Sequence, residues 1–172
     1  MQILKLFAGI ALATLVHFVG MSLWPQFGQV IDVFLIVVAL HGMRGNSLSA
    51  LFVGLLVGLL HDSLTGEHRF GLFGFADTII GYVTARLAQR LVIQRATGVF
   101  GVVSFAAVLQ QALVTGLAFL LLPAPELPSP LWIAVRAGAC GLLGMAVYVA
   151  TSRWRRSSEA RRRGRMSRLR LG

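Results

Sequence analysis

The sequence predicts an all-α integral membrane protein, a compact bundle of six transmembrane helices. Of its 172 residues, 56% are hydrophobic and only 13% are charged, whereas about 25% of the residues in a soluble domain are charged. The mean hydropathy is +0.78. Long apolar runs, separated by short polar or proline-containing breaks, fill most of the chain up to Val149, and the chain length leaves no room for a separate soluble domain.

The first two apolar runs each allow an alternative. Residues 3–23 are longer than the apolar core of about 7–15 residues in a signal peptide, and no clear cleavage site follows, so we predict an uncleaved first span. The second run, residues 30–40, crosses a bilayer only when it is extended to 26–43. If it is re-entrant, the chain has five spans. The other expected spans are 47–64, 70–91, 97–122 and 131–150.

The third and fourth runs meet at a polar turn, residues 65–69, and each contains one aspartate, Asp62 or Asp77. Because an ionisable group in a span costs about 2.5–3.5 kcal/mol on insertion scales, such residues normally face protein. On a helical wheel each aspartate shares a face with small residues, which allow close helix packing. We therefore predict a tight hairpin with inward acidic groups. The faces are Ser47, Ala50, Gly54, Gly58, His61 and Asp62, and Gly74, Asp77, Gly81, Thr84 or Ala85, and Ala88.

The fifth and sixth runs also carry polar or small residues on one face. The wheel places Arg136 opposite the small face of the sixth run, where it either pairs with an aspartate of another helix or reaches the interface. Elsewhere, His17 is either a packing residue or a proton relay, and Cys140 is a small buried residue. The two faces are Ser104, Ala107, Gln111, Thr115 and Ala118, and Ala134, Ala137, Gly138, Gly141, Gly144 and Tyr148.

Positive charges predict that both termini are cytoplasmic. Six spans then leave only Arg69 outside, with Arg136 near the outer edge, while the inside set holds the tail and Lys5, Arg44, Arg86, Arg90 and Arg95. The same topology places four charged residues from different helices at similar depth in the outer half. They form either a shared polar cluster or separate interfacial groups. The four are Asp32, Asp62, Asp77 and Arg136.

A basic tail, residues 153–172, follows the membrane domain, residues 1–152. Between positions 153 and 170 it holds nine arginines and a single glutamate. The favoured interpretation is an anchor for anionic lipids, worth about 1 kcal/mol per arginine near the surface. A dock for an acidic cytoplasmic protein is the second, and we expect no nucleic-acid binding. The predicted lipid contacts are Arg153, Arg155, Arg156, Arg161, Arg162 and Arg163.

The sequence offers little catalytic chemistry. His61 and Asp62 are the only close acid–base pair, and adjacent helical residues point about 100° apart. The glycines fit no nucleotide-binding pattern, and no metal-ligand spacing occurs. We predict a non-enzymatic protein without a cofactor or a metal.

The order of features resembles the MreD family of rod shape-determining membrane proteins. The resemblance covers residues 30–91, whereas the first, fifth and sixth spans match only in length and placement. Ile31 stands where the family often has proline, and the long arginine tail also departs from the pattern. The matching features are Ile31-Asp32 opening a span, Arg44 in a basic turn, Gly54-x3-Gly58-x3-Asp62, Gly66, Phe70-Gly71-Leu72, Ile80-Gly81-Tyr82 and Arg86-Leu87.

The resemblance implies a role rather than a reaction. MreD-like proteins lie in the bacterial inner membrane with the bitopic MreC and help link MreB filaments to RodA and a penicillin-binding transpeptidase. Their fold resembles the substrate-binding subunits of energy-coupling vitamin transporters. By this resemblance the chain is a scaffold subunit of the elongasome in lateral peptidoglycan synthesis and cell shape. The positions expected to matter for packing or partner binding are Asp32, Gly54, Gly58, Asp62, Gly71, Asp77, Gly81 and Arg136.

Two other functions compete with the scaffold. A substrate-binding subunit of a vitamin or small-molecule transporter shares the expected fold and needs an outward polar pocket. A membrane enzyme of a new kind is the third hypothesis, with the least support in the residues. The pocket of the transporter subunit would be lined by Asp62, Asp77, Gln111 and Arg136.

Overall fold

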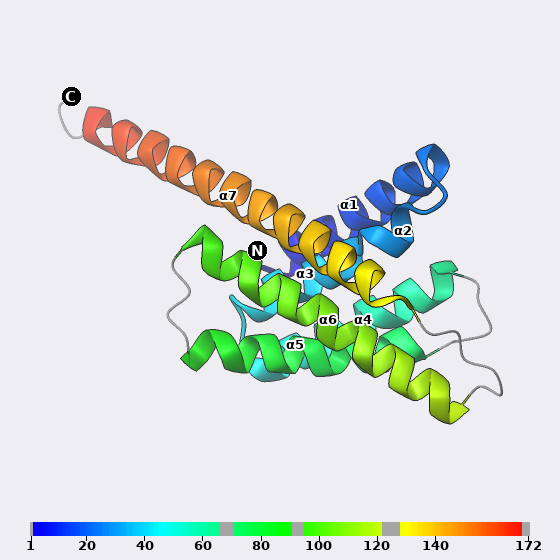
Figure 1. Ribbon diagram of the computed structural model, residues 1–172. Coiled ribbons are helices and arrows are strands. Elements are labelled where there is room, and N and C mark those ends of the chain that lie inside the picture. Colours follow the sequence, from blue (N-terminus) through cyan, green and yellow to red (C-terminus); the bar gives the residue numbers. More distant parts are fainter. Residues whose placement is uncertain (1, 66–70, 91–94, 122–127, 170–172) are drawn as a thin grey trace.

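The computed structural model is all-helical, as predicted, in the parts of the chain that it describes (Figure 1). It describes the backbone of residues 2–65, 71–90, 95–121 and 128–169, and side chains within 6–65, 71–90, 95–121 and 128–154. The centre of the polar turn after Thr65, with Arg69, and most of the proline-rich loop before Pro130 lie outside these ranges. The helices are α1 (Gln2–Leu23), α2 (Phe27–Val30), α3 (Val33–Gly42), α4 (Ser47–Thr65), α5 (Leu72–Arg90), α6 (Ala96–Leu121) and α7 (Pro130–Leu169).

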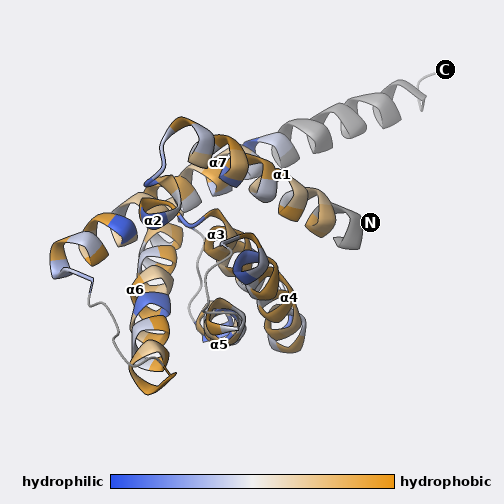
Figure 2. Cartoon of the chain, turned by 90° about the vertical axis from the view of Figure 1, so that its right-hand side faces the viewer, coloured by the Kyte–Doolittle hydropathy of each residue, from blue (hydrophilic) through white to orange (hydrophobic). Residues whose placement is uncertain are grey.

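Among the described residues, four helices are long and apolar enough to cross a membrane, which is compatible with a multi-pass membrane protein. The four segments are Leu6–Leu23, Ser47–Thr65, Ala96–Leu121 and Pro130–Trp154. Figure 2 shows apolar residues along all the helices, with few hydrophilic ones between them. The fourth expected span, α5, has 19 residues but carries Asp77, Arg86 and Arg90, which lower its hydropathy.

The second expected span is a broken helix rather than a continuous one. Ile31 and Asp32 are extended, with φ of −120° and −97°, and they separate the four-residue α2 from the ten-residue α3. The side chain of Asp32 caps α3 by accepting a hydrogen bond from the Leu35 N–H at 2.9 Å. An aspartate at this position satisfies a backbone donor that has no partner within the helix.

Helix α3 lies at the centre of the bundle, in contact with α1, α4, α5, α6 and α7. Its side chains Phe34, Leu35 and Val38 are fully buried. An apolar helix surrounded by others buries residues on all sides, which explains why this short segment has no polar face.

Helices α4 and α5 form the tight hairpin that the sequence predicts. A side chain at Gly54 would meet the backbone of Asp77, one at Gly58 would meet the backbone of Phe73, and one at Gly81 would meet the carbonyl of Ala50. Glycine is needed at these positions because the two backbones touch directly. The predicted inward face of α4 is buried throughout, with Asp62 at its far end.

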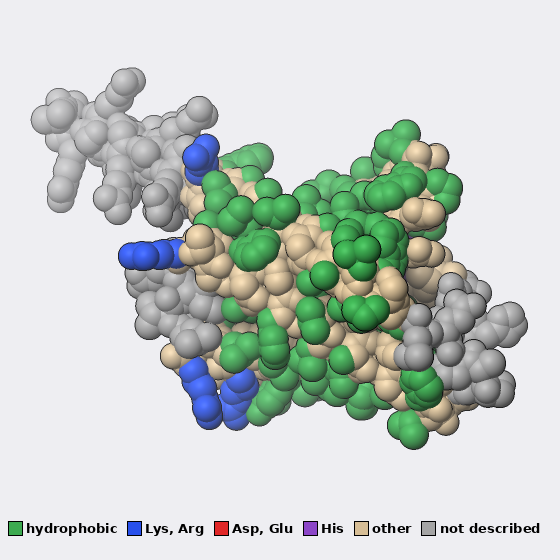
Figure 3. Space-filling view, viewed as in Figure 1, with side chains coloured by type: hydrophobic (Ala, Val, Ile, Leu, Met, Phe, Trp, Pro, Cys, Tyr) green, Lys and Arg blue, Asp and Glu red, His purple; other side chains and the backbone are tan. Residues whose placement is uncertain are grey.

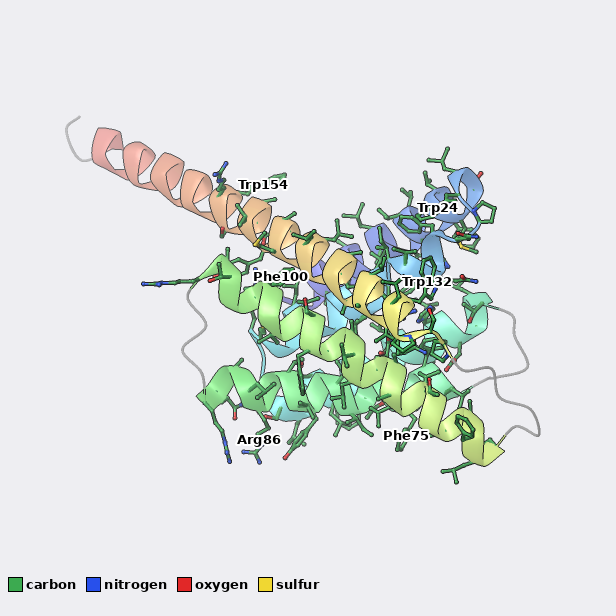
Figure 4. All side chains as sticks on the ribbon, viewed as in Figure 1. Trp24, Phe75, Arg86, Phe100, Trp132 and Trp154 are labelled. Atoms are coloured by element: carbon green, nitrogen blue, oxygen red, sulfur yellow. The ribbon has the colours of Figure 1, made fainter. Side chains whose placement is uncertain are left out.

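Basic side chains gather at one end of the molecule. Figure 3 shows them beside the start of the C-terminal extension, on a face that is otherwise mostly apolar. Arg44 lies 5.6 Å from the ring of Tyr148, and Arg86 and Arg90 lie in the last turns of α5. Figure 4 places Arg86 and Trp154 toward this end and Trp24 and Trp132 toward the other. This separation agrees with the grouping of charges expected from the sequence.

Candidate functional site: an intramembrane polar network

Buried polar side chains from every helix except the short α2 lie close together inside the bundle. Each of these helices contributes one side chain, with Asp32 serving at the capped start of α3. Such groups are rare in membrane spans and normally have a buried structural or functional reason to be there. The members of this polar network, from α1 to α7, are His17, Asp32, His61, Asp77, Gln110 and Arg136.

The guanidinium of Arg136 is the hub of this polar network. Its Nη2 donates to Asp32 Oδ2 at 2.9 Å and to Gln110 Oε1 at 2.8 Å. Its Nη1 donates to the backbone carbonyl of Gln29 at 3.3 Å, which ties α7 to the short α2. A charge-assisted bond to a carboxylate is stronger than a neutral one, and five donors allow one arginine to hold several acceptors.

Gln110 carries the network from Arg136 to Asp77. Its Nε2 donates to Asp77 Oδ1 at 2.8 Å, while its Oε1 accepts from the arginine. Asp77 and Gln110 have no exposed surface, Asp32 is 2% exposed and Arg136 is 9% exposed. Because no water competes for these bonds, each member depends strongly on the others.

Two histidines extend the network into an aromatic cluster. The Nδ1 of His61 lies 3.8 Å from Asp32 Oδ2. The His61 ring also packs against Phe73 and Phe34, at centroid distances of 4.3 and 4.9 Å. His17 lies 5.3 Å from Phe34 and 6.0 Å from His61. The surroundings of His17 are therefore those of a packing residue.

Asp62 belongs to a separate arrangement at the tip of the α4–α5 hairpin. Its Oδ2 accepts from the N–H groups of Gly71 and Gly74, at 3.0 and 2.9 Å, and its Oδ1 accepts from Phe73 N–H at 3.2 Å. These are donors at the start of α5, so the side chain caps a neighbouring helix. Gly71 has a φ of +97°, a conformation that favours glycine. Asp62 thus points away from its neighbour His61, which turns to Asp32.

The hypothesis of a shared cluster is confirmed for Asp32, Asp77 and Arg136. Asp62 does not belong to this cluster. The prediction about Arg136 requires one correction. The wheel placed it opposite the small face of its helix, but Arg136, Ala137 and Cys140 are all buried. The buried face of α7 is rotated to include the arginine, while Gly138 has no neighbouring atom within 4 Å of an added side chain.

Gln110 is the member that the sequence interpretation missed. The predicted polar stripe of α6 used Gln111, which instead donates to Thr115 on its own helix at 3.2 Å. The buried face contains Ala106, Ala107 and Gln110. The two adjacent glutamines differ by about 100° around the helix, and polarity alone does not distinguish them. The available signal in the sequence was the small residue Ala106, which stands four positions before Gln110 and so shares its helix face.

The remaining predicted positions have contacts of their own. The Cys140 thiol is buried at the α2–α3 break, where Sγ accepts from Asp32 N–H at 3.4 Å. The exposed Arg153 lies at the end of the apolar segment Pro130–Trp154, and the other tail arginines lie outside the described side chains. Among the described residues, no group of three or more potential ligands is arranged to hold a metal.

Comparison with known proteins assigns no family. No protein-family model matches the chain, and no curated protein or solved structure matches it.

Proposed function

We propose that this chain is a non-enzymatic subunit of the bacterial elongasome in the cell inner membrane. In this role it binds an MreC-like bitopic protein and helps link MreB filaments to RodA and a penicillin-binding transpeptidase. Its contribution to peptidoglycan synthesis and rod shape is that of a scaffold. The resemblance of residues 30–91 to the MreD family is the starting point of this proposal.

The observation that carries the proposal is that the residues which resemble the family hold helices together. Gly54, Gly58 and Gly81 bring the backbones of α4 and α5 together. Asp62 caps α5, and Asp32 caps α3 while holding Arg136. These residues are engaged in holding helices in place, which suits a scaffold whose outer surface presents partner sites.

The contacts favour the scaffold over a transporter subunit. The expected ligand pocket needs Asp62, Asp77, Gln111 and Arg136 to face one space. Asp62 is occupied by three backbone N–H groups, Asp77 is fully buried, and Gln111 bonds to Thr115. Each of these groups already has a protein partner or is enclosed by protein.

The proposed topology has six spans with both termini in the cytoplasm. The basic side chains that gather toward one end of the molecule in Figure 3 support it, because cytoplasmic loops are enriched in basic residues. Helix α5 has 19 residues, about 28 Å at 1.5 Å per residue, which nearly matches the hydrocarbon thickness. A reporter protein that is active only in the cytoplasm should be active when it is fused after Arg44 and also when it is fused after Gly172. A periplasmic signal from either would exclude this topology.

The tail is proposed to bind anionic lipids. Helix α7 continues from its membrane segment through Leu169 and carries the arginines past the basic end of the bundle. In nanodiscs, anionic lipid should raise the melting temperature of the full chain more than that of a chain ending at Trp154. Equal shifts for both chains would exclude a lipid-binding role for the tail.

The test of the function is affinity purification from native membranes in mild detergent, combined with shape complementation. We expect MreC-like and wall-synthesis proteins to co-purify with the wild type. Cells that depend on Asp32→Asn should lose rod shape, whereas cells that depend on the matched control Ser63→Ala should keep it, because Ser63 is exposed and bonds only to its own helix. Recovery of an energy-coupling ATPase with its membrane scaffold would show a transporter subunit instead.

A further inference from the structure

With its two histidines neutral, the polar network carries a net negative charge if both of its carboxyl groups are ionised. Arg136 is the only arginine or lysine of the described side chains that bonds to the network. It makes a direct ion pair with Asp32 at 2.9 Å and reaches Asp77 only through the amide of Gln110. Two carboxylates and one guanidinium would leave a net negative charge enclosed by protein within the membrane.

Asp77 is the carboxyl group whose negative charge would have no direct ion-pair partner. Its Oδ1 accepts one bond, from a neutral amide, and its Oδ2 has no hydrogen-bond partner among the described residues. Asp32, in contrast, has Arg136 and the Leu35 N–H, and Asp62 has three backbone N–H groups. An isolated carboxylate without exposed surface is very unfavourable unless it is paired or neutralised.

The groups around Asp77 include two negative charges as well as one positive charge and one amide. Asp32 at the start of α3 and Asp62 on α4 both act on it as negative charges, opposed by Arg136 on α7. Gln110 on α6 offers an amide dipole, and His61 on α4 faces Asp32. Arg136, the one guanidinium among these described groups, already pairs with the closer carboxylate of Asp32.

We propose that Asp77 is a proton-binding site and holds a neutral carboxylic acid at neutral pH. The side chain has no exposed surface, so a proton suits this position better than a larger cation. With the proton bound and both histidines neutral, Asp32 and Arg136 are the charged pair of the network, and its net charge is zero. This inference is independent of the proposed scaffold function, because it concerns the internal charge of the bundle.

Infrared spectroscopy of the purified protein in lipid tests the proposal directly. A protonated carboxyl group has a C=O stretching band that an ionised carboxylate lacks. At neutral pH we expect this band in the wild type, its loss in Asp77→Asn and its retention in the control Asp62→Asn. Absence of the band from the wild type, or its persistence in Asp77→Asn, would overturn the proposal.

Folding of the variants provides a second measurement. Asparagine is the neutral isostere of a protonated aspartate and keeps an oxygen that accepts from Gln110. The melting temperature of Asp77→Asn should therefore stay close to that of the wild type, while Arg136→Gln lowers it clearly. If Asp77→Asn does not fold, Asp77→Glu should shift the frequency of the wild-type band, and an unshifted band would assign the proton elsewhere.

Discussion

Arg136 and Asp32 are 104 positions apart in the sequence, yet Nη2 of the arginine lies 2.9 Å from Oδ2 of the aspartate. The pair connects the broken α2–α3 segment to α7. It also positions the arginine to hold Gln110 and, through it, Asp77. A single long-range contact thus organises the polar interior of the bundle.

The first prediction concerns this ion pair. Asp32→Asn or Arg136→Gln should each lower the free energy of unfolding by about 3–5 kcal/mol, because each leaves an unpaired buried charge. The double variant should lose less than the sum of the two single variants. Thermal unfolding in detergent, arranged as a double-mutant cycle, measures the difference. Strict additivity of the two losses would show that the pair does not act as a unit.

The second prediction compares the adjacent glutamines of α6. Gln110→Leu should destabilise the protein by about 1–3 kcal/mol, since it removes one acceptor from Arg136 and the amide that donates to Asp77. The control Gln111→Leu loses only a bond to Thr115 and should change stability by about 0.5 kcal/mol or less. Melting curves of the two variants, recorded in the same detergent, decide the comparison. Equal losses would contradict the network.

The third prediction concerns the contact of α4 with α5. Gly54→Ala places a methyl group against the backbone of Asp77, which cannot move aside as a side chain can. Overpacking of this kind costs about 1–3 kcal/mol. The control Gly138→Ala has open space and should be neutral or stabilising, because alanine favours helices by up to about 1 kcal/mol. Size-exclusion profiles after stepwise heating compare the thermal stability of the two variants with that of the wild type. A Gly54→Ala variant as stable as the wild type would argue against close contact between the two backbones.

The fourth prediction concerns the cap at the hairpin tip. Asp62→Ala removes the acceptor of three backbone N–H groups, and loss of a helix cap costs about 0.5–2 kcal/mol. We expect faster hydrogen exchange at the start of α5, measured by mass spectrometry, while exchange in the middle of α6 stays unchanged. Ser63→Ala is the matched control on the same turn of α4. Unchanged exchange in Asp62→Ala would mean that the cap is dispensable.

The sequence by itself determined the fold class and the inward faces of α4 and α5. Apolar run length decides whether a helix can span a membrane. Glycine and alanine spacing marks a face where backbones approach, as at Gly54 and Gly81. Both signals are local, because they depend on residues within one or two turns of each other.

Only the tertiary structure decided which polar residues meet. The break at Ile31 and Asp32 depends on Cys140 and Arg136, more than a hundred positions away. The choice of Gln110 over Gln111 depends on the rotation of α6 against its neighbours, and a rotation of about 100° exchanges the two. Helix rotation is set by packing between distant segments, and a single helix carries only part of that information. The contacts of the polar network therefore depend on how all of these helices pack together.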